Sequence, residues 1–358
     1  MSMTPWWNPL TRWRRAPPQT TAPDESAAEP HRAEPVTPSA TPGSAAPQDD
    51  AQPEIRTPIE LQCRFAAWLF GLPQEPLRVG VAPPAAPRTA RLFEQLDQVI
   101  ASDALRATLL PRAPHVVPQL MKALRDERYS SVDVAERISK DVVLTAEVIR
   151  SATSAFQRDG EGDIDLARAV AVIGTQGLRR AIASVVLRPI FDARGDSLSA
   201  RAAAQIWTDA DRKARLCTAL ATPAGLDPFD GYLAGLLHNT GWSAMLRAID
   251  GFTDLKFGPS ELAHAAVLPD LLKRRDALFG ALVQPWQLGR AVSESAGDVG
   301  RRGLEAASSP LGAALRAADR LALLRALSQG SRPGAEAVPE WDALPQPVQE
   351  CYAGLRGA

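Results

Sequence analysis

Residues 233–246 read LAGLLHNTGWSAML, and this stretch decides the fold. Apolar residues lead up to a polar pair, His238 and Asn239, and resume after Gly241 with helical spacing. The pattern predicts an apolar helix up to the His-Asn pair, a break at Gly241, and a second apolar helix. We expect Asn239 to cap a helix or to adopt left-handed backbone, because asparagine is suited to both so close to a glycine.

Helical periodicity continues on both sides of this stretch, and almost no segment alternates with the period of two that is typical of strands. Before it, helices are expected at 59–70, 88–110, 116–126, 132–140, 142–155, 164–173, 176–187 and 199–222. After it, helices are expected at 268–282, 286–295, 310–327 and 347–355. Short breakers separate them, among them Gly174. The sequence therefore predicts an all-α fold, a multi-helix bundle.

The composition excludes several classes of protein. The 358 residues have a formal net charge of -1, so no global attraction to nucleic acid or anionic lipid is expected. Cys63, Cys217 and Cys351 lie too far apart for a zinc motif or a disulfide framework, and reduced thiols are typical of cytosol. The most apolar candidate for a membrane span, residues 59–72, is too short and carries charges. A soluble, cytoplasmic protein without a membrane span is expected.

The first 58 residues contain 12 of the 31 prolines, and such a composition predicts a disordered tail. The start of this tail is different, because Trp6, Trp7 and Trp13 alternate with arginines. The three tryptophans are candidate anchors for a protein partner or for peripheral contact with a membrane. The alternative is an exposed tail that has no fixed partner.

Four histidines occur in the chain, and only His238 lies in the central stretch. A two-metal hydrolase needs about four or more histidine or carboxylate ligands that converge from different helices. Asn239 offers a carbonyl oxygen but no negative charge to balance a dication. We therefore expect no metal ion and no other cofactor, and a buried His238 that hydrogen-bonds across a helix junction is favoured over a catalytic role.

Several motifs follow one another in an order that resembles a known family. In chain order they read LPRAPHVVPQLMKALRD, VDVAERISKDVVLTAEVIRSATSAF, IDLARAVAVIGTQGLRRAIASVVL and GLDPFDGYLAGLLHNTGW, with IW and an Ala-rich helix before the last. Together they resemble the HDOD domain of bacterial signalling proteins, over residues 109–297. The resemblance implies an all-helical domain related to the HD-type metal-dependent phosphohydrolases, usually without demonstrated enzymatic activity, that acts in signal transduction through protein contacts.

The chain departs from the family pattern at its polar positions. His238-Asn239 stands where the His-Asp doublet is found, and Asp209 and Asp276 stand where relatives often carry histidine. The family's Asn-Ser-Ala is Thr-Ser-Ala at 153–155, and a later histidine pair is replaced by Ser-Ala at 295–296. The resemblance thus implies an incomplete ligand set. It leaves a vestigial pocket, formed by Asp209, His238, Asn239 and Asp276, that is a candidate for ligand binding.

We expect a tail at 1–58, a helical extension and linker at 59–108, an HDOD-like domain at 109–297 and C-terminal helices at 298–358. The expected function is that of a non-catalytic regulatory module which binds a signalling protein. Two alternatives stay open. One is a residual phosphodiesterase or nucleotide hydrolase with an unusual metal shell, and the other is a nucleotide sensor that does not hydrolyse its ligand.

Overall fold

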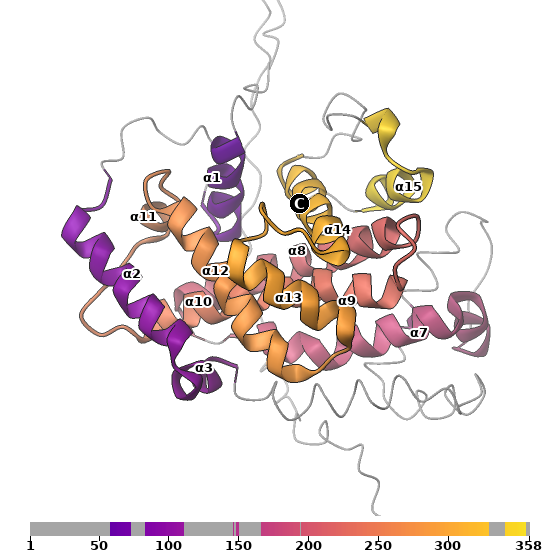
Figure 1. Ribbon diagram of the computed structural model, residues 1–358, viewed down its shortest axis with the longest axis horizontal. Coiled ribbons are helices and arrows are strands. Elements are labelled where there is room, and N and C mark those ends of the chain that lie inside the picture. Colours follow the sequence, from indigo (N-terminus) through magenta and orange to yellow (C-terminus); the bar gives the residue numbers. More distant parts are fainter. Residues whose placement is uncertain are drawn as a thin grey trace, which may run out of the picture. The chain divides into compact units, whose positions relative to one another are not determined.

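The computed structural model describes residues 58–72, 83–110, 146, 148–149, 166–193, 195–328 and 341–355. Within these residues the regular structure is helical, with no strand, and this confirms the all-α prediction. Figure 1 shows the arrangement of the helices. They are α1 (Pro58–Leu69), α2 (Ala86–Ala101), α3 (Asp103–Leu109), α7 (Leu166–Phe191), α8 (Leu198–Ala221), α9 (Pro228–His238), α10 (Thr240–Gly251), α11 (Pro259–Leu262), α12 (Leu268–Val283), α13 (Arg290–Arg302), α14 (Pro310–Leu327) and α15 (Gln346–Gly354), with 3-10 turns at Gln284–Trp286 and Trp341–Ala343.

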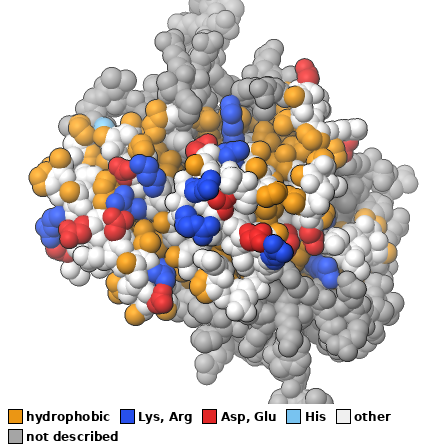
Figure 2. All heavy atoms as spheres, in the orientation of Figure 1, with side chains coloured by type: hydrophobic (Ala, Val, Ile, Leu, Met, Phe, Trp, Pro, Cys, Tyr) orange, Lys and Arg blue, Asp and Glu red, His pale blue; other side chains and the backbone are white. Residues whose placement is uncertain are grey.

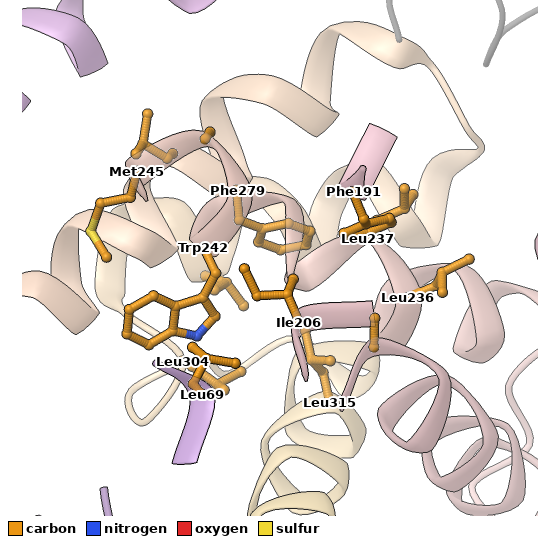
Figure 3. Packing of buried hydrophobic residues seen from close by; sticks show 14 of the residues in the cluster. Leu69, Phe191, Ile206, Leu236, Leu237, Trp242, Met245, Phe279, Leu304 and Leu315 are labelled. Carbon is orange, nitrogen blue, oxygen red and sulfur yellow. The ribbon is translucent and has the colours of Figure 1, made fainter. Parts of the chain in front are cut away.

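Helix α8 is central to the packing, because it contacts α9 most extensively and also packs against α14, α10 and α15. Its apolar stripe, which includes Ile206, Ala210, Ala214 and Cys217, is buried as the helical spacing predicts. Large apolar side chains from seven helices join one cluster (Figure 3): Leu69, Phe191, Ile206, Leu237, Trp242, Phe279 and Leu315. Burial of one such side chain stabilises the fold by about 1.5–3 kcal/mol, so this cluster holds the bundle together.

The central stretch forms two helices as predicted, but the break lies at Asn239 and not at Gly241. Asn239 has φ -73° and ψ -5°, which is right-handed backbone, and its side chain does not cap α10. Asn239 therefore lies at the cap position of both helices, as expected, but the predicted left-handed backbone is wrong. Gly241 lies inside α10, where a Cβ atom would come within 2.3 Å of the carbonyl oxygen of Arg275. The glycine thus permits close packing of α10 on α12 rather than a break.

A second glycine, Gly235 in α9, has the same function on the other side of the stretch. A Cβ atom there would come within 2.6 Å of the backbone of both Lys213 and Ala214 in α8. Because Gly235 has no side chain, the backbones of α8 and α9 can approach each other at this point. The polar residues of the two helices are thereby brought close together.

Two other boundaries differ from the prediction. The single helix expected at 88–110 is divided into α2 and α3 at Ser102, whose hydroxyl accepts a hydrogen bond from the Leu105 N–H at 3.3 Å and caps α3. The helix expected at 286–295 begins only at Arg290, after Gln287 and Gly289 adopt positive φ. The predicted break at Gly174 is confirmed, because this residue has φ 61° and ψ -174° within α7.

Helices outside the central part share its core. Helix α1 packs on α14, and α2 packs on α12 and α10. Three ion pairs, which we call the α2 seam, join α2 to the segment 254–274: Arg88 with Glu261, Arg91 with Asp254, and Asp97 with Arg274. The division into segments 59–108, 109–297 and 298–358 stays a prediction, but apolar side chains from all three join one cluster.

Some expectations fall on parts of the chain outside the described residues. These are the tail with its three tryptophans and the helices at 116–126 and 132–140, together with most of 142–155. One described helix, Ala169–Phe191, rather than residues 59–72, is long and apolar enough by length and composition to cross a membrane. It is interrupted at Gly174, so its regular part is shorter than the about 20 residues that a span requires.

Candidate functional site

A group of charged and polar side chains lies within the apolar interior, and we call it the polar centre. Its members come from α8, from the junction of α9 and α10, and from α12 and α14: Asp209, Lys213, His238, Asn239, Arg275, Asp276 and Asp319. None of these residues exposes more than 7% of its surface. Groups of this kind are almost never buried unless they are paired, so their contacts decide what the centre can do.

The amine of Lys213 lies in the middle of the polar centre. Its Nζ atom is 2.5 Å from Asp319 Oδ1, 2.7 Å from Asn239 Oδ1, 3.1 Å from His238 Nδ1 and 3.3 Å from Asp209 Oδ2. The three shorter contacts match the three N–H donors of an ammonium group. The centre is thus organised around a cation that belongs to the chain itself.

Asn239 uses both ends of its amide. Its Oδ1 accepts from Lys213, while its Nδ2 donates to the carbonyl oxygen of Ile206 at 3.0 Å and to Asp209 Oδ2 at 2.9 Å. These partners assign the orientation of the amide. A carboxylate in this position could make neither donation, and it would lie against the carboxylate of Asp209. The amide therefore suits the surroundings that this chain provides.

His238 is fully buried between two charged partners. Its Nδ1 accepts from Lys213, so its Nε2–H donates to Asp276 Oδ1 at 3.1 Å. Burial, and then the charges of Lys213 and Arg275, lower the pKa of His238 to about 4. The imidazole is therefore neutral at pH 7. It is bonded across the helix junction, as the sequence predicts.

Asp276 and Arg275 form the other half of the centre. The Arg275 guanidinium contacts Asp276 Oδ1 at 2.7 Å, and the Leu304 N–H donates to Asp276 Oδ2 at 2.8 Å. Burial would raise the pKa of Asp276, but Arg275, His238 and the Leu304 N–H lower it on balance. The pKa of Asp319 is likewise well below its usual range, because Lys213 and Arg275 outweigh its burial. Both aspartates are therefore carboxylates at neutral pH.

The structure brings together all four residues predicted for the pocket, namely Asp209, His238, Asn239 and Asp276. That a ligand binds there stays a prediction, as does the role of Trp6, Trp7 and Trp13, which lie outside the described residues. Two further positions that depart from the family pattern, Ser295 and Ala296, are buried in α13, and the Ser295 hydroxyl has no hydrogen-bond partner among the described residues.

Sequence reasoning missed Lys213, Arg275 and Asp319. A signal was present for two of them, because Lys213 follows Asp209 by four residues on the apolar stripe of α8, and Asp319 follows the buried Leu315 by four on α14. A charged residue at a core position of a helix needs a partner. The sequence could have shown that need, but it could not have identified the partner.

A family model of the HDOD domain matches residues 110–297, which is more than half of the chain. The chain belongs to the HDOD domain family. Among curated proteins it is similar to an uncharacterized protein from Treponema pallidum (strain Nichols), with 27% identity over 157 residues. This match covers 43% of the chain and 30% of that protein, so the chain spans less than a third of the relative's length.

Two solved structures are also similar. One, described as "Putative metal-dependent phosphohydrolase" from Shewanella amazonensis SB2B, has a TM-score of 0.55 and 20% identity, and covers 75% of this chain and 98% of that one. The other is an HDOD domain protein from Geobacter sulfurreducens, with a TM-score of 0.45 and 21% identity over 74% of this chain and 88% of that one. At this level of identity the likeness to the first structure shows the fold alone.

The residues of this HDOD chain do not fit the metal ion that a phosphohydrolase of this fold implies. Among the described residues, no group of three or more His, Cys, Asp or Glu side chains is arranged to hold one. Lys213 Nζ lies at the point where His238, Asn239 and Asp319 converge, and a dication there would be repelled by the ammonium.

Proposed function

We propose that this chain is a non-catalytic HDOD module that acts in bacterial signal transduction or regulation by binding a protein partner in the cytoplasm. The observation that supports this proposal is the closed polar centre. His238 and Asn239 expose 0% of their surface, and their polar atoms bond to groups of the same chain. A substrate would have to displace these bonds and open the core before it could meet either side chain.

The competing reading is a metal-dependent hydrolase, as the description of the Shewanella amazonensis structure suggests for that protein. Protein purified without chelator would be analysed for manganese, iron, nickel and zinc. It would then be assayed with each ion on a phosphodiester such as bis(p-nitrophenyl) phosphate and on cyclic dinucleotides. We expect less than stoichiometric metal and no turnover above buffer. Turnover that is lost in His238→Gln, which removes the imidazole but keeps a polar side chain, would refute the non-catalytic proposal.

The second reading is a nucleotide sensor without hydrolysis. Thermal unfolding with nucleotides and cyclic dinucleotides tests it, because a ligand at 100 times its dissociation constant stabilises a protein by about 2.7 kcal/mol. We expect no shift, since the polar centre is filled by side chains of the chain itself. A saturable shift would favour the sensor.

The face shown in Figure 2 supports protein binding over nucleic-acid binding. Lys and Arg side chains lie beside Asp and Glu side chains there, rather than in a large patch of one sign. A basic stripe is the usual footprint of a nucleic-acid partner. A surface on which apolar side chains lie between charged side chains of both signs is compatible with a protein interface.

The tail is the proposed second contact with the partner. A segment that binds the partner together with the domain raises the effective concentration of both contacts. We would compare partner capture by the full chain, by the chain without residues 1–58, and by a variant with Trp6, Trp7 and Trp13 changed to alanine. We expect both changes to weaken capture. Equal capture by all three proteins would refute the two-contact arrangement and leave the domain as the sole binding element.

A further inference from the structure

We infer that the Lys213 ammonium is the cation held in a cage of four acceptor atoms. The Lys213 ammonium and the neutral Asn239 amide together carry the same net charge as a divalent metal ion beside a carboxylate. This inference rests on the proposed function only in taking the wild-type centre as non-catalytic. It goes beyond that function, because it names the side chain that keeps a divalent ion out of the centre.

The cage consists of four acceptor atoms that surround Lys213 Nζ. Acceptor atoms reach Lys213 Nζ from α8 (Asp209), from the junction of α9 and α10 (His238 and Asn239) and from α14 (Asp319). One imidazole nitrogen and three oxygens are a donor set that divalent transition ions also accept. Such ions need contacts of about 2.0–2.2 Å, so the cage would have to contract around a metal ion. The observed distances of 2.5–3.3 Å suit an ammonium.

The net charge of the polar centre is the second reason for this inference. Lys213 and Arg275 are the cationic side chains of the polar centre, and Asp209, Asp276 and Asp319 are its acidic ones. Replacing the ammonium by a dication adds one positive charge, and replacing the Asn239 amide by a carboxylate adds one negative charge. The two exchanges together leave the net charge of the centre unchanged, whereas either exchange alone changes it by one unit.

The position of Lys213 is fixed by the fold. The side chain exposes 1% of its surface, and its backbone lies against Gly235, where no side chain separates α8 from α9. The stem of Lys213 therefore cannot swing into solvent to admit a metal ion unless the two helices part. The wild-type cage should thus exclude divalent ions even when they are in excess.

The test is a double variant, Lys213→Ala with Asn239→Asp, stripped with chelator and titrated with Mn²⁺ or Zn²⁺ by calorimetry and by thermal unfolding. We expect one ion per chain and a melting temperature that rises with metal concentration. The matched control, Lys273→Ala with Asn239→Asp, removes an exposed lysine instead and should bind no ion at the same concentrations. Wild-type protein should bind none.

Several outcomes would overturn the inference. They are a folded double variant that binds no ion, a control that binds as well as the double variant, and wild-type protein that takes up one ion per chain. These measurements are separate from turnover. Hydrolysis by wild-type protein would therefore refute the proposed function without deciding whether Lys213 excludes divalent ions from the cage. Likewise, failure of the double variant to bind metal would leave partner binding by the wild type untouched.

A measurement on wild-type protein decides the matter if the double variant does not fold. Reductive methylation of the native chain, read by peptide mass spectrometry, should modify the exposed Lys256 and Lys273 and leave Lys213 unmodified. Excess Mn²⁺ should not change this pattern. Modification of Lys213 at the rate of Lys256, or an increase in its modification on adding Mn²⁺, would show that the ammonium does not close the cage.

Discussion

The polar centre and the α2 seam are built from similar charged side chains in opposite surroundings. Lys213 and Asp319 expose 1% and 9% of their side chains, whereas Arg91 and Asp254 in the seam expose 57% and 53%. An unpaired charge in the core has no water to compensate it, but an unpaired charge in the seam is solvated at once. Removal of a single partner should therefore lower the stability much more in the polar centre than in the α2 seam, although the ion pairs have similar geometry.

The largest expected effect is that of Lys213→Met. The change leaves Asp209 and Asp319 buried without their cation. Breaking a buried pair in this way costs about 3–5 kcal/mol in the free energy of unfolding. Urea denaturation measures the loss, with Lys273→Met as the control at a position that is 74% exposed and should change stability little. A loss below about 1 kcal/mol would mean that the centre behaves like the seam.

Acid should affect the centre next most strongly, through His238. Its pKa is about 4 in the folded chain, against the ordinary value of 6.5, so the unfolded chain takes up the proton first as the pH falls. Stability is therefore lost between pH 6.5 and 4, by about 3 kcal/mol in total for the 2.5 units of difference. The free energy of unfolding would be measured across this range for wild type and for His238→Gln. Identical slopes in the two proteins would contradict the assignment to His238.

A smaller effect is expected for Arg274→Gln in the α2 seam. Arg274 binds both oxygens of Asp97, at 2.9 and 2.7 Å, and its guanidinium lies 4.2 Å from the centre of the Phe93 ring. A bidentate ion pair that is stacked on an aromatic ring but open to water contributes about 1 kcal/mol to the free energy of unfolding. Chemical denaturation would measure it. A loss as large as that of Lys213→Met would show that the seam is shielded from solvent.

The smallest effect is expected for Arg91→Gln. Its ion pair with Asp254, at 2.6 Å, joins two side chains that are more than half exposed. Such pairs contribute about 0.2–1 kcal/mol and are screened by salt. The difference from wild type should disappear in about 1 M NaCl, where the Debye length is about 3 Å. A difference that persists in high salt would contradict the comparison between the two regions.

The sequence alone was sufficient for the local features. The apolar stripes of α8, α12 and α14 predicted their helices closely, because burial of one face imposes a period that can be read along the chain. The order of motifs was sufficient to predict the HDOD family. The sequence predicted the break at Gly241, whereas it lies at Asn239. In sequence alone, a glycine that permits close packing of two helices cannot be distinguished from a glycine that ends a helix.

Tertiary structure alone decided what the polar centre is. Asp209, His238, Asn239 and Asp276 could be selected one by one, but no local pattern showed that Lys213 would lie among them or that Asp319 would pair with it from α14. Those contacts depend on the close approach of α8 to α9 at Gly235 and of α10 to α12 at Gly241. Periodicity shows which residues are buried, whereas the identity of their partners depends on how distant helices pack.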